Sequence, residues 1–574
     1  MIPGMKNALV KNYRSLGADG AVLLWLGVWW VCNIVLAATA ELANDEAYYW
    51  MFAEHLAWGY FDHPPMTALL VWLGQHVWPG TELGVRFFFT LLQPLYLYLL
   101  WRLIRPADAV RRDGELFAMI SAATLMLQLY GFIAVPDGPL MMTATLFLLV
   151  LGRFAERRRG AWLWLGLAMA AMAYSKYHGA LVVLFALAAN PRLLRRPGLY
   201  AGGAVALLLL VPHFLWQYHH DWASFAYHLS GRNAQFRLSY VTDFVANMLV
   251  VFNPLYLPLY IKAWRAARPE DAVRRALKCF PAAFVGFFLL SAFRGYVQPQ
   301  WVIVAALGLV CVLFDYARRH PRTRRYVMRA GWVVVALMAL VRIEMMFNPL
   351  GIRFEVFDNK ASYGAIAREA DGRPIIFRGS YAVAAKYRFY TGGEAYCQPN
   401  IGYRTHQWQF RDDDSRFAGR EVLVETPRRE PGDTLFRTQS IALANGRGFT
   451  WLVDPDFRPV RLVDAAFAGL PEQVVPGQEL RMRVRLANPY DYEVEIGGET
   501  ELVMVWKHGR FEVEEIPTGV RCTIPARSET EAEATLRVPE RLVGKEYAAG
   551  FALRREGRTH WFNGKPLRTE VLKP

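Results

Sequence analysis

The chain has 574 residues, of which 54% are hydrophobic and 20% are charged, and its mean hydropathy is +0.14. A soluble protein of this length normally has a negative mean, so the average indicates a membrane portion. The apolar content excludes a disordered chain, and five cysteines are too few for a disulfide scaffold. The net charge of +15 would suit nucleic acid, so its meaning depends on where the charges lie.

Apolar runs recur from Ala21 to about Phe347 and predict about eleven membrane helices. The runs are 21–40, 84–101, 115–135, 138–152, 161–175, 179–190, 199–216, 242–261, 279–293, 301–316 and 330–347. Several are shorter than the roughly 20 residues that a bilayer requires. These runs therefore need flanking residues, a tilt or a break near the membrane surface.

Positive charge alternates along the segments that separate these runs. If the amino terminus is inside, the inside segments hold 26 Lys and Arg, whereas the outside segments hold four. The positive-inside rule therefore predicts a cytoplasmic amino terminus and places everything after residue 347 outside. The basic balance then reflects membrane orientation, and no nucleic-acid partner is expected. The first apolar run lacks a convincing cleavage site, which favours a membrane helix over a signal peptide.

The part of the chain after residue 347 begins with the pattern of a small α/β domain. A buried-type strand is expected at 373–377, followed by a helix that Ser380 caps and Gly392-Gly393 ends. A second strand follows at 421–425. Strand, helix and strand together predict an α/β domain over about 348–455.

The last part of the chain alternates apolar and polar residues. Such runs occur at 480–486, 502–506 and 532–538, and turn sequences separate them. This spacing predicts a β-sandwich over 456–574. The expected fold class is a polytopic α-helical membrane protein, with the membrane domain over 1–347, an outer α/β unit and a C-terminal β-sandwich.

The first outer segment, 41–83, contains six acids and no Lys or Arg, and is rich in Trp and Tyr. Residues 45–57 have helical spacing and predict a helix on the membrane surface. Pro64-Pro65 fits the first turn of a second such helix, which would end near Trp78.

Asp45 and Glu46 lie where the first membrane helix meets this outer segment. Burying an acid at this depth costs free energy, so the acid is expected to take part in a reaction or to be paired with a cation. The two acids fit a general base that is directed at an acceptor hydroxyl. They fit equally well a helix cap, because Asn44 or Asp45 would cap the surface helix.

The shorter outer connections also contain polar side chains. Asp137 lies in a Pro-Asp-Gly-Pro sequence, which a turn alone would explain. Lys176 and Arg294 are cations at membrane depth, where an anionic partner is the natural explanation. The same connections hold His178, Gln298 and Gln300.

Carboxylates and cations would therefore meet at the outer face. The carboxylates are Asp45, Glu46, Asp62 and Asp137, the cations are Lys176 and Arg294, and His63 and His178 are further donors. This combination suits a reaction between a hydroxyl and a phosphate-bearing donor. A base takes the proton and the cations stabilise the charge on the leaving phosphate. Because the groups lie at the lipid boundary, the phosphate could belong to a lipid.

Four motifs carry a resemblance to a known family. They are Asn44-Asp-Glu-Ala-Tyr-Tyr-Trp50, Asp62-His-Pro-Pro-Met66, Pro136-Asp-Gly-Pro-Leu140 and Ser175-Lys-Tyr-His-Gly179. In these motifs the chain resembles the bacterial GT-C glycosyltransferases, relatives of the protein O-mannosyltransferases and of the lipid A aminoarabinose transferases. The resemblance covers about 20–347 and extends more weakly into 348–450.

The resemblance implies an inverting glycosyltransferase that takes a sugar from a polyprenyl-phosphate carrier. The family's base would be Asp45, with Glu46 beside it. The position that binds the carrier phosphate before Pro-Pro is His63 here, which is a departure from a basic residue, so Lys176 and Arg294 would share that role. Donor or acceptor contacts would fall to Asp62, Asp137, His178, Gln298 and Gln300.

The resemblance also sets the expected partners and location. The donor would be a polyprenyl-phosphate-linked sugar, and the acceptor a lipid such as lipid A, a glycan, a glycolipid or a protein at the outer face of the bacterial cytoplasmic membrane. The sequence shows no dedicated cluster of His or Cys ligands, and because family members vary in metal use, a divalent metal is left open. Asp412–Asp414 is interpreted as a solvated turn. The alternative function is a multi-span transporter or a flippase for lipid-linked sugars.

Overall fold

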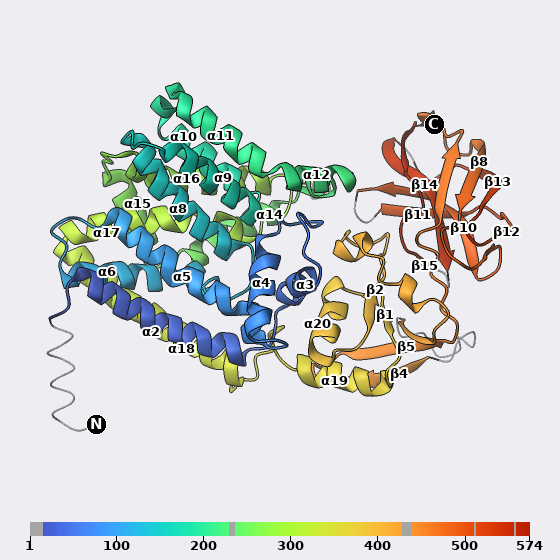
Figure 1. Ribbon diagram of the computed structural model, residues 1–574, viewed down its shortest axis with the longest axis horizontal. Coiled ribbons are helices and arrows are strands. Elements are labelled where there is room, and N and C mark those ends of the chain that lie inside the picture. Colours follow the sequence, from blue (N-terminus) through green and yellow to red (C-terminus); the bar gives the residue numbers. More distant parts are fainter. Residues whose placement is uncertain are drawn as a thin grey trace. The chain divides into compact units, whose positions relative to one another are not determined.

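The computed structural model contains two compact units, Met1–Phe357 and Asp358–Pro574 (Figure 1). The structure describes residues 15–228, 236–426, 438–509, 512–542, 544–555 and 558–573. Most of the predicted cytoplasmic amino terminus, residues 1–14, and the middle of the predicted outer loop 217–241, residues 229–235, lie outside the described residues. The division of the second unit into the domains 348–455 and 456–574 stays a prediction.

The first unit is helical throughout its described residues. Its α-helices are α2 (Ala18–Thr39), α3 (Asn44–Ala53), α4 (Met66–Val77), α5 (Glu82–Ile104), α6 (Arg111–Ala122), α7 (Leu125–Leu129), α8 (Asp137–Ala155), α9 (Ala161–Ser175), α10 (Gly179–Ala188), α11 (Pro197–Leu209), α12 (Val211–His219), α13 (Ala223–Ala226), α14 (Leu238–Val251), α15 (Leu257–Ala266), α16 (Ala272–Ala292), α17 (Ala305–Arg319) and α18 (Pro321–Phe347). Short 3₁₀ turns precede α11 and α17, at Pro191–Arg195 and Pro299–Val302.

Five of these helices, α2, α5, α8, α16 and α18, are long and apolar enough to cross a membrane. The pair α11 and α12 would make a sixth span with a bend of 47°. Four shorter apolar helices, α4, α9, α10 and α14, have 10 to 17 residues. The prediction of several membrane helices is confirmed, whereas the count of eleven stays a prediction.

Two predicted spans are broken in the structure. The span predicted at 242–261 divides into α14 and α15, because Asn253 has a φ of 71° and Pro254 follows it. The span predicted at 115–135 divides into α6 and the short α7. At this division the Asn253 side-chain amide donates to the Ala123 carbonyl oxygen at 3.0 Å. Beyond it, the Gln93 side-chain amide donates to the Leu127 carbonyl oxygen at 2.5 Å, where α7 ends. At both breaks backbone groups lose their partners within the helix, and side chains form hydrogen bonds with some of them.

The two helices predicted in the first outer segment are present as α3 and α4, and their place on the membrane surface stays a prediction. α3 ends at Ala53, four residues before the predicted end. The Tyr60 hydroxyl lies 3.1 Å from the carbonyl oxygens of Phe52 and His55 and satisfies the backbone there. α3 is therefore a short helix with a fixed end, and its first turn holds Asp45 and Glu46.

The second unit begins with an α/β arrangement. After α19 (Asn359–Ala370), strand β1 (Ile375–Phe377) leads through α20 (Tyr381–Thr391) to the parallel strand β2 (Ala395–Cys397). The sheet has the order β2-β1-β3-β5-β4, with β3 at Val422–Glu425, β4 at Gln439–Ala442 and β5 at Gly448–Asp454. Ser380 accepts from the Ala382 amide and Gly392 has a φ of 67°, so both predicted helix ends are confirmed.

The remainder of the second unit is rich in strands. One sheet has the order β11-β10-β14-β16-β7, with β15 beside β14, another has the order β13-β8-β6, and β12 pairs with β9. The strands are β6 (Asp464–Ala468), β7 (Gln473–Val474), β8 (Glu479–Ala487), β9 (Val494–Ile496), β10 (Thr500–His508), β11 (Glu512–Pro517), β12 (Cys522–Ile524), β13 (Glu529–Arg537), β14 (Lys545–Arg555), β15 (Arg558–Thr559) and β16 (Leu567–Val571). Alternate residues of β8 are buried against Trp506 and Phe551, as a strand with one covered face requires. The strand-rich C-terminal region is thus confirmed.

The acids Asp412–Asp414 do not form the solvated turn that was expected. Asp414 is buried and pairs with Arg461 at 2.9 Å, and Asp413 pairs with Arg411 at 2.9 Å. Only Asp412 is exposed. The adjacent Arg411 and the distant Arg388 and Arg461 neutralise these acids, and a run of three aspartates does not reveal the distant partners.

Candidate active site

Glu46 belongs to a buried ion pair at the start of α3. Its side chain is fully buried, and its Oε2 lies 2.6 Å from Nη2 of Arg86 on α5. The Arg86 Nε also donates to Oε1 at 2.7 Å, so the pair is bidentate. The backbone amides of Ala134 and Ala43 donate to the same carboxylate, each at 2.9 Å. All the strong acceptor positions of Glu46 are therefore in use.

Arg86 joins this carboxylate to the end of α2. Its guanidinium donates to the carbonyl oxygens of Ala37, Ala40 and Glu41. Burial alone would raise the pKa of Glu46, but Arg86 and the two backbone amides outweigh burial and hold that pKa below its ordinary value. Glu46 thus stays ionised and fixes the junction of α2, α3 and α5.

A second buried ion pair joins α8 to α9. Asp137 is the first residue of α8, and its Oδ1 lies 2.7 Å from Nζ of Lys176, the residue that ends α9. Both side chains are about 95% buried, at 4% and 5% exposure. The cation at membrane depth therefore has an anionic partner from the neighbouring outer connection.

Asp45 differs from both acids because it is half-buried. It precedes Glu46 on the first turn of α3, and it lies close enough to Asp137 for the two charges to interact. The Tyr130 hydroxyl is near both carboxylates and near Tyr296. Asp45 and the pair of Asp137 with Lys176 therefore form one site.

Asp62 and His63 lie beside a cluster of aromatic rings and histidines. The Asp62 carbonyl oxygen accepts from Nε2 of His228 at 2.9 Å. The His63 ring is 5.4 Å from that of Tyr49, one turn after Asp45 on α3. The His228 ring is also 5.4 Å from that of Tyr177, which follows Lys176. This cluster connects the predicted phosphate contact His63 to the α3 side of the site.

The sequence analysis missed Tyr177, His213 and His228. The Tyr177 hydroxyl is 3.3 Å from Nε2 of His213, whose Nδ1 is 2.8 Å from the Trp58 carbonyl oxygen. A histidine in an otherwise apolar run, as at 213, was the available signal.

His178, Gln298 and Gln300 come together around Trp301. The His178 ring is 5.4 Å from that of Trp301, whose indole N–H donates to Gln298 Oε1 at 2.9 Å. The Gln300 side-chain amide donates to the same oxygen at 3.3 Å. Arg294, at the end of α16, is exposed, and within the described residues it has no ion pair. It is the predicted cation that is still available to an anion from outside.

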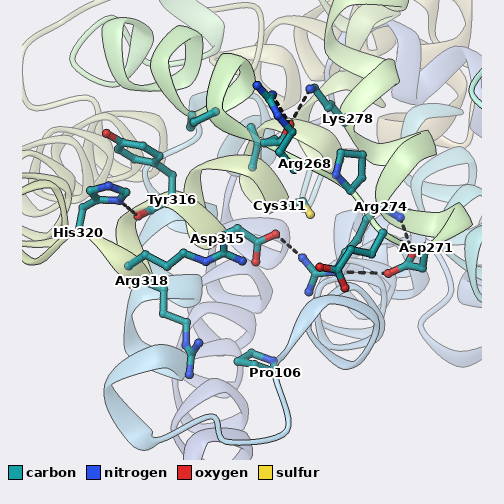
Figure 2. A pocket seen from close by; sticks show the side chains of 17 residues that line it. Pro106, Arg268, Asp271, Arg274, Lys278, Cys311, Asp315, Tyr316, Arg318 and His320 are labelled. Atoms are coloured by element: carbon teal, nitrogen blue, oxygen red, sulfur yellow. Dashed lines mark hydrogen bonds and ion pairs between the residues drawn. The ribbon is translucent and has the colours of Figure 1, made fainter.

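A polar cavity of about 360 Å³ lies elsewhere, between segments that were predicted to be inside (Figure 2). In it Arg274 points between Asp271 and Asp315. Arg318 also lines the cavity and pairs at 2.7 Å with Asp108, which is not a lining residue. None of its lining residues belongs to the site around Asp45. Two of its arginines, Arg274 and Arg318, are in ion pairs, and none of the predicted site residues lines the cavity, so it is not the candidate active site.

Comparisons with known proteins address the same part of the chain. Residues 62–216 match the family model described as "Dolichyl-phosphate-mannose-protein mannosyltransferase". The apo crystal structure of ArnT from Cupriavidus metallidurans superposes with a TM-score of 0.58 at 14% identity, covering 76% of this chain and 98% of that one. The same protein bound to undecaprenyl phosphate gives 0.57 at 16% identity, covering 75% and 97%. The resemblance to the GT-C glycosyltransferases is confirmed.

These similarities have a defined extent. At such identities the superpositions establish the fold, and the family match covers Asp62, His63, Asp137, Lys176 and His178 but not Asp45. No curated protein matches the chain. The chain therefore shares the fold of the ArnT structures and resembles the mannosyltransferase family over residues 62–216, whereas the roles of individual residues remain predictions.

Proposed function

We propose that this chain transfers a sugar from a polyprenyl-phosphate carrier to an envelope acceptor at the outer face of the bacterial cytoplasmic membrane, with inversion at the anomeric carbon. The observation that carries the proposal is the half-buried Asp45 beside the buried pair of Asp137 and Lys176. A carboxylate that is partly open to solvent, beside a fixed cation, suits a base and a leaving phosphate. The undecaprenyl phosphate bound to the similar ArnT structure supports a carrier of this kind.

In the proposed reaction Asp45 takes the proton of an acceptor hydroxyl as that oxygen attacks the anomeric carbon. The bond between this carbon and the carrier phosphate breaks, and the phosphate leaves with the electron pair. Glu46 is unsuited to this step because Arg86 and two backbone amides occupy its carboxylate. We therefore assign Glu46 a positioning role, in which it fixes the turn that presents Asp45.

The leaving phosphate needs positive charge that is oriented before the reaction. Lys176 is held by Asp137 and supplies a fixed cation, and the exposed Arg294 can bind a phosphate that approaches from the membrane. His63 contributes from the aromatic cluster below α3. Asp62, His178, Gln298 and Gln300 remain our candidates for contacts to the donor or acceptor sugar.

The test uses the purified full chain, envelope lipids as acceptor, and undecaprenyl phosphate linked to one hexose, one pentose or one amino sugar. Mass spectrometry follows the release of free undecaprenyl phosphate. We expect Asp45→Asn to lower turnover by about 10²- to 10⁴-fold while donor binding is retained. Asp243→Asn, an exposed acid on α14, is the matched control and should turn over normally.

Two outcomes would overturn the proposal. Unchanged turnover in Asp45→Asn would remove the proposed base. Movement of the intact donor across a vesicle membrane, without release of the carrier, would favour a flippase instead.

A further inference from the structure

A lateral groove in the first unit lies away from the Asp45 site and contains an unneutralised cation. Its volume is about 350 Å³, and its mostly apolar walls come from α2, α6 and α18. α2 and α18 run side by side in Figure 1 and pack on α6. Val28 and Trp332 on the rim are 52% and 49% exposed, as expected for side chains that face lipid.

The cation is Arg342, five residues before the end of α18 and so about 7.5 Å inside that end. Its Nη2 donates to Asn33 Oδ1 at 2.8 Å and to Gln128 Oε1 at 2.9 Å, and its guanidinium lies 6.0 Å from the Phe132 ring. These partners are neutral. Within the described residues Arg342 has no ion pair, and its buried Nη1 has no hydrogen-bond acceptor. An arginine at membrane depth without a counter-charge is expensive, so an anion from outside the chain is indicated.

The contrast with two other buried cations of this unit sharpens this point. Arg86 pairs with Glu46 and Lys176 pairs with Asp137. Arg342 instead donates to two neutral amides, which hold the guanidinium at the wall of the groove without neutralising it. Arg342 is therefore held in a fixed position and keeps its positive charge, as is typical of an arginine that binds a phosphate.

The walls of the groove indicate which phosphate compound fits. Trp25 and Trp29 line it, and within the described residues neither indole N–H has an acceptor. A glycerophospholipid offers ester carbonyl oxygens between its phosphate and its chains, whereas a polyprenyl phosphate has only hydrocarbon there. We propose that the groove binds one anionic glycerophospholipid of the outer leaflet, with an acyl chain between α2, α6 and α18 and the phosphate at Arg342.

The bound lipid would stabilise the connection before α8, which helps to position α3 and therefore Asp45. The centre of the Phe132 ring is 6.0 Å from the guanidinium carbon of Arg342 and 5.9 Å from that of Arg86. Ala134, two residues later, donates to Glu46. A phosphate held by Arg342 would therefore lie near the connection whose Ala134 amide holds the start of α3.

Cys32 provides a direct test because it is exposed and lines the groove. The delipidated full chain is treated with N-ethylmaleimide in detergent alone, with dioleoylphosphatidylglycerol or with dioleoylphosphatidylcholine, and peptide mass spectrometry measures the labelling of Cys32. We expect phosphatidylglycerol to slow this labelling at least fivefold and phosphatidylcholine to leave it unchanged. Cys279, on α16 and outside the groove, is the internal control.

Variants separate charge from folding. Arg342→Gln should lose the protection by phosphatidylglycerol, Arg342→Lys should keep it, and Arg329→Gln, exposed on the same helix, should also keep it. Equal protection by both lipids, or full protection in Arg342→Gln, would overturn the proposal. Protection by undecaprenyl phosphate at lower concentration than phosphatidylglycerol would also overturn it, because the occupant would then be the carrier. These measurements need no turnover, so they stand apart from the test of Asp45.

Discussion

Two ion pairs of the membrane unit are equally buried and differ in what surrounds them. The pair of Glu46 with Arg86 is enclosed by backbone groups from α2, α3 and the connection before α8, so every strong donor and acceptor is in use. The pair of Asp137 with Lys176 rests on one contact and lies beside the half-buried Asp45. The pair of Glu46 with Arg86 thus holds three helices together, whereas the pair of Asp137 with Lys176 can still interact with a ligand.

This difference teaches how to separate structural charge from functional charge. A buried carboxylate that accepts from two backbone amides and a bidentate arginine has no lone pair left for a substrate. A pair with a single contact can exchange its partner when a phosphate arrives. The comparison predicts that changes in the first pair will appear in folding, whereas changes in the second will appear in turnover.

The largest effect is expected when one partner of the first pair is removed. Arg86→Met leaves the Glu46 carboxylate buried and uncompensated, and should lower the free energy of unfolding by about 3–5 kcal/mol. Thermal unfolding of the purified chain in detergent measures this change. The double variant Glu46→Gln with Arg86→Gln should recover most of the loss. A stable Arg86→Met variant would contradict the structural role of the pair.

The second pair should respond in the opposite way. The double variant Asp137→Asn with Lys176→Gln replaces the ion pair by two neutral amides. It should fold nearly as well as the wild type and lose about 100-fold in turnover, because the leaving phosphate loses a fixed cation. Carrier release and thermal unfolding are measured on the same sample. Loss of stability with unchanged turnover would place this pair in the scaffold with Glu46.

The Glu46 pair also predicts a pH dependence. Arg86 and the two amides overcome burial and hold the pKa of Glu46 below its ordinary value of 4.5, so the folded state binds this proton less readily than the unfolded state. The resulting stability is complete above pH 4.5 and is lost as the pH falls toward the lowered pKa. Glu46→Gln should remove this part, so its unfolding free energy should fall less steeply on acidification, by at most about 1.4 kcal/mol per pH unit. Parallel curves for the two proteins would contradict the lowered pKa.

The sequence predicted the ends of helices better than it predicted the ion pairs of Glu46 and Asp137. Ser380 and Gly392 mark the ends of α20 because a cap and a left-handed residue act within one turn. The acids at Asp45 and Glu46 were found as a set, but one residue decides their roles. Arg86 lies 40 residues later inside an apolar run, and only the folded chain places it against Glu46.

The sequence alone could have predicted that the cations within apolar runs are important. Arg86 and Arg342 both lie in or beside apolar runs, where a cation indicates a partner or a function. What no pattern could supply is the difference between them, since one meets a carboxylate and the other meets Asn33 and Gln128. The breaks in two predicted spans also depend on a contact distant in sequence, because Asn253, which lies at one break, donates to the Ala123 carbonyl oxygen at the other.

The smallest expected effect belongs to Arg294. This side chain is exposed and within the described residues it has no ion pair, so it can attract the carrier phosphate without being part of a fixed network. Arg294→Gln should raise the KM for the undecaprenyl-phosphate sugar about threefold and leave kcat unchanged, because an exposed charge contributes little in water. The effect should fade as salt is raised from 0.05 to about 0.5 M, where the screening length becomes short. Arg237→Gln, an exposed arginine before α14, is the matched control. A fall in kcat at constant KM would instead show that Arg294 stabilises the leaving phosphate, as proposed for Lys176. Two cations would then act on the leaving group, whereas the Glu46 pair would remain structural.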